Sequence, residues 1–97
     1  MLRNFLLKNK NPNDCSINNQ YLNVQIDTIG AELKSIYANK KEYLWQANKD
    51  IWNEQAPLLF PLVGNLENDE IFIKNKISKM KNHGFLKNME FIIIGNL

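Results

Sequence analysis

The chain has 97 residues, enough for one small domain or for a piece of a larger one. Hydrophobic residues make up 44% of it and charged residues 23%, which is an ordinary globular composition. Twelve basic against ten acidic side chains leave a net charge of only +2, without the concentrated basic face that phosphate binding requires, so no nucleic-acid partner is expected.

Cysteine content and apolar runs exclude further classes. The one cysteine, Cys15, rules out an internal disulfide and a cysteine zinc site. No apolar run approaches the length of a membrane span, so no membrane partner is expected. The apolar patch FLL near the start is shorter than a secretory signal requires, and a cytoplasmic location is therefore expected.

Two regions are predicted. Residues 1–16 are polar, contain the turn cluster NPND, and are predicted to be a poorly ordered leader. Residues 17–97 are predicted to form one β domain. Within it, apolar and polar residues alternate in YLNVQID, the period of a half-buried strand. A second strand is predicted over GAELKSIYA, which would also pass as a helical turn, and a short aromatic strand over EYLW, residues 42–45.

The second half of the chain begins with a segment that two prolines interrupt. Residues 47–55 could hold one helical turn, but the prolines of APLLFP forbid a regular element there, and an irregular, buried crossing segment is predicted. EIFIKNKISK, residues 70–79, is predicted to be a hairpin with Asn75-Lys76 at its turn. The last element, MEFIII, residues 89–94, is predicted to be a buried strand.

Because nearly every predicted element is a strand, the fold class is all-β. A fully apolar last strand needs a facing sheet to cover it, and the chain supplies little with which to do so. Exposed strand edges therefore make self-association an expectation. Core positions are predicted for four phenylalanines: Phe60, Phe72, Phe85 and Phe91.

Five motifs carry a family resemblance: GAELKSI, EYLWQ, IW, APLLFPLVGNL and HGFLKNMEF. In this order, and with this spacing, they resemble the start of the aldose 1-epimerase (galactose mutarotase) family, and most closely its LacX-like bacterial branch. The resemblance runs from about residue 17 to residue 94. Each motif alone is weak, whereas five in succession are specific.

The resemblance implies the N-terminal part of a galactose mutarotase-like antiparallel β-sandwich (a supersandwich), truncated at its C-terminus. It implies an isomerase of carbohydrate metabolism that interconverts the α and β anomers of a hexose such as galactose or glucose, without a metal or organic cofactor. A carboxylate would act as base and an imidazole as acid, both within reach of one sugar ring. Family members carry these two groups farther along, so no catalytic residue is expected in this chain, and it is expected to be inactive alone.

Three residues match positions that bind substrate in the family. His83, in HGF, matches the first active-site histidine, which contacts and orients the sugar. Asn65, in FPLVGNL, stands where the family usually has a sugar-binding arginine, and Lys87 also replaces a common arginine. Asparagine loses the charge and the planar fork of arginine, and lysine keeps only the charge.

Each candidate also has a simpler interpretation. From composition alone, His83 before Gly84 is more often turn punctuation than a site residue. The carboxylates of LENDE lack the spacing of a calcium loop, and Glu32 is expected to be an exposed strand carboxylate. Trp45 and Trp52 could stack on a sugar but more often fill a core. Because of these two tryptophans, a non-catalytic carbohydrate-binding module is an alternative function. A structural fragment that self-associates is another alternative.

Overall fold

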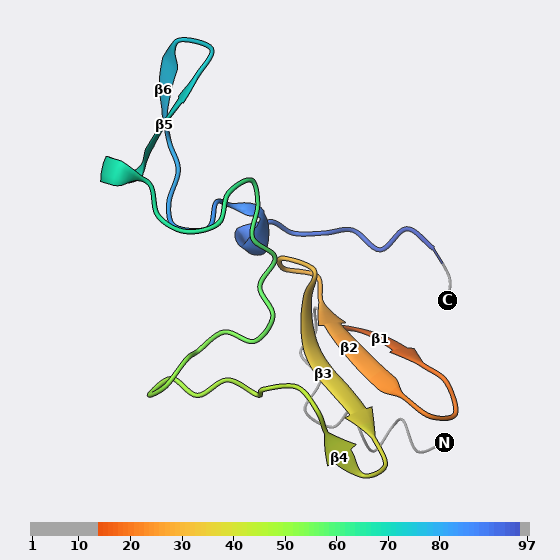
Figure 1. Ribbon diagram of the computed structural model, residues 1–97. Coiled ribbons are helices and arrows are strands. Elements are labelled where there is room, and N and C mark those ends of the chain that lie inside the picture. The colour runs from red at the N-terminus through yellow and green to blue at the C-terminus, as the bar shows by residue number, and fades with distance from the viewer. Residues whose placement is uncertain (1–13, 96–97) are drawn as a thin grey trace.

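The computed structural model describes residues 14–95, and these form a four-stranded sheet and a separate two-stranded hairpin (Figure 1). The sheet is an antiparallel meander in the order β1-β2-β3-β4. Its strands are β1 (Asp14–Asn18), β2 (Asn23–Asp27), β3 (Glu32–Ala38) and β4 (Lys41–Glu42). Most of the predicted leader, residues 1–13, lies outside the described residues. Asp14 to Ser16, the last three residues of the predicted leader, belong to β1, which pairs with β2 along its whole length.

The register of the sheet separates an apolar face from a polar face. Val24 pairs with Ile36, and Ile26 pairs with Leu33, so these side chains share one face. On the other face Asn23 pairs with Tyr37 and Gln25 with Ser35. The alternation in YLNVQID thus predicts this strand correctly, and GAELKSIYA forms a strand and not a helical turn.

A β-bulge in β3 places a backbone carbonyl for contacts outside the sheet. Gln25 pairs with Ser35 and Ile26 with Leu33, which leaves Lys34 as the extra residue. The Lys34 carbonyl accepts hydrogen bonds from the side-chain amides of Gln46 and Gln55, each at 2.9 Å. The bulge therefore fastens the segment after β4 to the sheet.

The strand predicted over residues 42–45 is much shorter in the structure. β4 ends at Glu42, whose carboxylate accepts the backbone N–H groups of Ile36 at 2.8 Å and Leu44 at 3.0 Å and also the Ser35 hydroxyl. These bonds turn the chain away from β3 before a longer ladder can form. From there to residue 66 the chain is irregular and contains a cis Phe60–Pro61 bond. The irregular course of the proline-containing segment is as predicted, but its predicted burial is wrong, because residues 56–66 are all half-buried or exposed.

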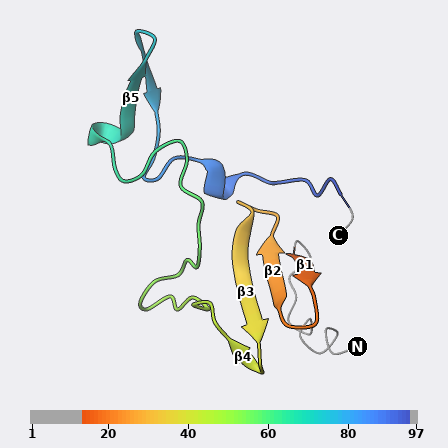
Figure 2. The ribbon, with the colours of Figure 1, turned by 45° about the vertical axis from the view of Figure 1, so that its right-hand side comes forward.

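The predicted hairpin forms, and its side chains are largely exposed. It follows a 3₁₀ turn, η1 (Glu67–Asp69), and consists of β5 (Glu70–Ile73) and β6 (Lys76–Lys79). Its turn is Lys74-Asn75, one residue earlier than predicted, and both residues have the positive φ of a tight two-residue hairpin turn. Figures 1 and 2 show the hairpin projecting away from the sheet in both views.

The final strand predicted over residues 89–94 does not form. After a second 3₁₀ turn, η2 (Leu86–Asn88), only an isolated bridge joins Glu90 to Ile29. Ile92 and Ile94 are 83% and 94% exposed. No strand among the described residues lies beside this segment, so its backbone has no ladder to complete and its side chains have no cover.

The described residues have no fully buried hydrophobic core. None of their hydrophobic side chains is fully buried, and the four phenylalanines predicted for a core are all exposed. The Cα radius of gyration is 16.8 Å, against about 13 Å for a compact chain of 100 residues. In this part of the chain, no helix has the length and apolar character needed to cross a membrane.

Candidate functional site

His83 lies in a turn that is bonded to the proline-containing segment. We call residues 60–64 and 81–86 together the His83 clamp. The His83 N–H donates to the Gly64 carbonyl at 2.9 Å, and the Gly64 N–H donates back to the imidazole Nδ1 at 2.8 Å. The His83 carbonyl accepts the Phe60 N–H at 3.2 Å. The half-buried histidine is therefore tied at its backbone and at its ring.

The residue after His83 has to be glycine for this clamp to close. Gly84 is buried, has a φ of +78°, and forms a parallel bridge with Phe60. A Cβ at this position would lie 2.1 Å from the Phe60 carbonyl oxygen, much closer than atoms can approach. His83 itself has a φ of +65°, in the left-handed region that β-branched residues avoid. The His-Gly pair thus forms a tight turn, and the same turn orients the imidazole.

The structure brings Asn65 close to His83, because Asn65 directly follows Gly64. Asn65 is exposed, so its amide is accessible from solvent at the edge of the clamp. An amide supplies both a donor and an acceptor to a hydroxyl group. Two of the three predicted substrate-binding residues are therefore brought near each other by the hydrogen bonds between Gly64 and His83.

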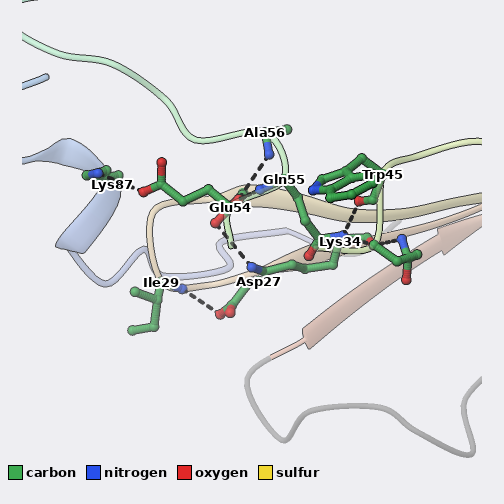
Figure 3. A network of polar contacts seen from close by, with 10 residues as sticks. Asp27, Ile29, Lys34, Trp45, Glu54, Gln55, Ala56 and Lys87 are labelled. Carbon is green, nitrogen blue, oxygen red and sulfur yellow. Dashed lines mark hydrogen bonds and ion pairs between the residues drawn. The ribbon is translucent and has the colours of Figure 1, made fainter. Parts of the chain in front are cut away.

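Lys87 is directed elsewhere. It lies in η2, and its Nζ is 2.7 Å from Oε1 of Glu54, with the lysine side chain 22% exposed (Figure 3). η2 rests on the β2–β3 turn, where a Cβ on Gly30 would come within 2.5 Å of the Lys87 carbonyl oxygen. The ammonium of Lys87 thus already has a carboxylate partner, a contact that its sequence motif did not indicate.

The segment that presents Glu54 is held by the carboxylate of Glu32 at the start of β3. Glu32 Oε2 accepts the backbone N–H groups of Gln55 and Ala56, each at 3.0 Å, and Oε1 pairs with Lys34 Nζ at 3.1 Å. Figure 3 shows this segment lying beside β3, with Glu54 extending toward Lys87. The expectation that Glu32 is exposed is wrong, since its side chain is only 13% exposed.

Electrostatics at Glu32 favour its charged form. Burial by itself raises the pKa of this carboxyl, but hydrogen bonds from the Ala56 and Gln55 N–H groups and the nearby Lys34 ammonium outweigh burial. The pKa of Glu32 therefore lies below its ordinary value, and the carboxylate is charged at neutral pH. Glu32 is a structural anchor for the segment and not a base beside His83.

The two tryptophans lie close together beside the same segment. The Trp45 indole Nε1 donates to the Trp52 carbonyl at 3.0 Å, and the Trp45 carbonyl accepts from the Gln55 side chain at 2.7 Å. Both rings keep a large exposed fraction. They are therefore not core residues within the described part of the chain.

Chemically, the clamp offers hydrogen bonding to a neutral polar ligand. The clamp carries the His83 imidazole, the exposed amide of Asn65 lies directly beside it, and the nearby Lys87 has its charge balanced by Glu54. Residues 14–95 contain no group of three histidine, cysteine or carboxylate side chains arranged to hold a metal ion.

Sequence reasoning missed two residues of this region, Glu54 and Gln55. Glu54 pairs with Lys87 across 33 positions of sequence, and Gln55 binds carbonyls of both Lys34 and Trp45. No local motif signals such long-range partners. The charge of Lys87, half-buried in an otherwise uncharged turn, is the one feature that points to an acidic partner.

Comparison with known proteins agrees with the motifs. The family model for aldose 1-epimerase matches residues 14–96. This chain belongs to the aldose 1-epimerase family. Among curated proteins, the plasmid and chromosomal LacX proteins of Lactococcus lactis subsp. lactis are each 40% identical over 83 residues. The alignment covers 79% of this chain and 28% of each LacX protein.

Two solved structures identify the fold of this member of the aldose 1-epimerase family. A galactose mutarotase related enzyme from Lactobacillus acidophilus matches with a TM-score of 0.82 at 40% identity, over 87% of this chain and 29% of that one. A galactose mutarotase-like protein from Lactobacillus casei matches with a TM-score of 0.82 at 31% identity, over the same shares. The described strands are thus part of a galactose mutarotase-like antiparallel β fold, and the chain spans less than a third of the length of these LacX and mutarotase-like relatives.

Proposed function

We propose that this chain contributes the first sugar-contacting residues of an aldose 1-epimerase-type site, for a hexose such as galactose or glucose. The observation that carries the proposal is the His83 clamp, which fixes the imidazole through Nδ1 and leaves its other nitrogen for a ligand. Family membership supplies the reaction: interconversion of the α and β anomers in carbohydrate metabolism. The proposal includes no metal and no organic cofactor.

Within this proposal the three candidate residues have different roles. His83 contacts the sugar, and Asn65, beside it, hydrogen-bonds a hydroxyl without the charge of the usual arginine. Lys87 is also proposed at the sugar, through ammonium protons that Glu54 does not accept, because Lys87 Nζ has three donors and one carboxylate contact. Lys87 is the weakest of the three, since the ion pair already orients its charge.

A sugar titration followed by heteronuclear NMR tests the binding proposal. Galactose and glucose should shift signals of Gly64, Asn65 and His83, and mannitol, an open-chain polyol, should not. Shifts confined to Trp45 and Trp52 would favour the carbohydrate-binding module instead. An absence of any sugar-dependent shift would reject the proposed site.

An anomer-exchange assay tests whether the chain alone catalyses the reaction. In this proposal the base and the acid come from parts of the family fold that this chain, which covers 28–29% of its relatives, does not include. A coupled polarimetric measurement on the isolated chain should therefore match the rate in buffer. A clear rate that His83→Ala abolishes would contradict this and would place the needed groups within the chain.

A second candidate function, association through uncovered apolar surface, is favoured by the exposure of large side chains. Ile92, Ile93 and Ile94 follow one another with no cover, and the hairpin exposes Phe72 and Ile77. Surfaces of this kind pair with other chains. Sedimentation equilibrium should reveal concentration-dependent association, and a monomer at all concentrations would remove this candidate.

The cytoplasmic location stays a prediction. Fractionation of cells that express the natural gene, with detection of the native protein, would test it. Recovery in the cytoplasmic fraction is expected, and recovery in the membrane fraction or the medium would contradict it.

A further inference from the structure

The bond between Gly64 and the His83 ring has a consequence for the position of the imidazole proton. A backbone N–H group is a donor and never an acceptor. The Gly64 nitrogen lies 2.8 Å from His83 Nδ1, so Nδ1 must offer its lone pair to that proton. A neutral imidazole with a lone pair at Nδ1 carries its hydrogen on Nε2.

Two features make this assignment hard to reverse within the described structure. The His83 N–H donates back to the Gly64 carbonyl at 2.9 Å, so the two residues are bonded in both directions and cannot slide past each other. In addition, the close approach of Gly84 to Phe60 fixes the turn that carries the ring. A hydrogen on Nδ1 would point at the Gly64 N–H and would require the turn to open.

We propose that the Gly64 N–H holds His83 as the Nε2–H tautomer, so that His83 meets a sugar as a hydrogen-bond donor to a ring or hydroxyl oxygen. This inference rests on the proposed function only for the identity of the acceptor. Gly64 is then a positioning residue: it acts on the ligand through the tautomer that it imposes on His83. The sugar atom facing His83 must supply a lone pair, and a derivative lacking that oxygen would bind more weakly.

The tautomer can be read directly from the full chain labelled with ¹⁵N at histidine. Because the chain has one histidine, a long-range ¹H–¹⁵N correlation spectrum gives one unambiguous pattern. At a pH where the ring is neutral, Nε2 should resonate as a protonated nitrogen and Nδ1 as an unprotonated one. The Nδ1–H tautomer, or the averaged mixture typical of free histidine, would overturn the proposal.

Two substitutions separate positioning from loss of the side chain. In His83→Asn, the side-chain oxygen can take the place of Nδ1, and asparagine tolerates the left-handed backbone of this position. The Gly64 amide signal should therefore stay near its native shift in His83→Asn and move in His83→Ala, while sugar-dependent shifts are lost in both. Equal movement of the Gly64 signal in the two variants would contradict the positioning role.

The tautomer measurement needs no sugar. A wrong tautomer prediction can therefore be distinguished from a wrong sugar-binding prediction. A correct tautomer without sugar-dependent shifts would reject the sugar site and retain the Gly64–His83 assignment. Sugar-dependent shifts together with the Nδ1–H tautomer would reject the Gly64–His83 assignment and retain the sugar site.

Discussion

The His83 clamp and the β5–β6 hairpin are neighbours in sequence but differ in what holds them. The hairpin leaves the clamp after Gly64 and returns to it at residue 81, and it has a complete antiparallel register and a tight turn. Its large apolar side chains are nevertheless exposed: Phe72 and Ile77, paired across its strands, are 66% and 64% exposed. The clamp has no regular ladder, yet its backbone and the His83 ring are bonded across the turn.

This difference shows that regular pairing and a fixed position are separate properties. An isolated two-stranded hairpin is marginally stable in water, because its ladder bonds compete with water and no apolar face is buried. The clamp instead depends on half-buried backbone contacts and on close approaches that only glycine permits. Contacts within this chain therefore fix His83, although none of the hydrophobic side chains among residues 14–95 is fully buried.

The largest expected effect comes from Gly84→Ala, which should open the clamp. A left-handed φ costs a residue with a Cβ about 1–2 kcal/mol, and the clash with the Phe60 carbonyl adds to this cost. The Gly64 amide signal and the His83 tautomer pattern should both change to those of an unrestrained turn. Gly95→Ala is the matched control, since its Cβ would meet nothing within 4 Å. A native spectrum for Gly84→Ala would show that the close approach to Phe60 does not exist.

The next effect concerns the Glu32 anchor. Glu32→Ala leaves the N–H groups of Gln55 and Ala56 without their acceptor, at a cost of about 1 kcal/mol for a half-buried site. Hydrogen exchange at these two amides should become about fivefold faster. Glu67→Ala, at an exposed carboxylate, is the control. Unchanged exchange in Glu32→Ala would mean that other contacts hold the segment.

The same anchor predicts a dependence on acid. Because the folded pKa of Glu32 lies below the ordinary value of 4.5, its charged form stabilises the folded segment. This contribution is present above pH 4.5 and is lost as the pH falls through the lowered pKa. Gln55 and Ala56 amide shifts should titrate in that acidic range, and Glu32→Gln should remove the titration. A midpoint above 4.5 would contradict the sign.

A smaller effect is expected at the Glu54–Lys87 pair. Partly exposed ion pairs contribute about 0.2–1 kcal/mol, so Glu54→Ala and Lys87→Ala should each loosen η2 only slightly. Protection of the Gly30 amide, which bonds the Met89 carbonyl behind η2, reports this loosening. Lys87→Arg should retain the native protection. If the double variant loosens η2 by the sum of the two single effects, the pair carries no interaction energy.

The smallest effect on the clamp should come from the hairpin. Replacing Phe72 and Ile77 by threonine changes exposed side chains, and the effect on clamp stability should stay within about 0.5 kcal/mol. The spectra of Gly64 and His83 should be unchanged. A shift of either signal would show that the hairpin packs against the clamp, and the contrast between the two regions would then fail.

The sequence predicts the local elements of this fold better than their packing. The alternation in β2 and the hairpin of β5 and β6 depend on neighbouring residues, and both elements are confirmed, although the hairpin turn lies one residue earlier than predicted. The predicted strand over residues 89–94 fails because a strand needs a partner, and an apolar run does not say whether one is present. The phenylalanine core fails for the same reason.

The candidate site shows the same limit. The motifs identify His83 and Asn65, and the structure joins them through Gly64, a contact that no spacing rule gives. Glu54 and Glu32 act through partners far away in sequence, so their roles follow only from three-dimensional positions. Substrate binding by His83, Asn65 and Lys87 stays a prediction.

Amide hydrogen exchange on the native chain tests the central claim most directly, because it compares the two regions in one sample. If contacts within this chain hold His83 in place, the amides of Gly64, His83 and Phe85 should exchange more slowly than those of β5 and β6. Equal exchange in both regions, or faster exchange in the clamp, would contradict the account and would mean that His83 is not held by contacts within this chain.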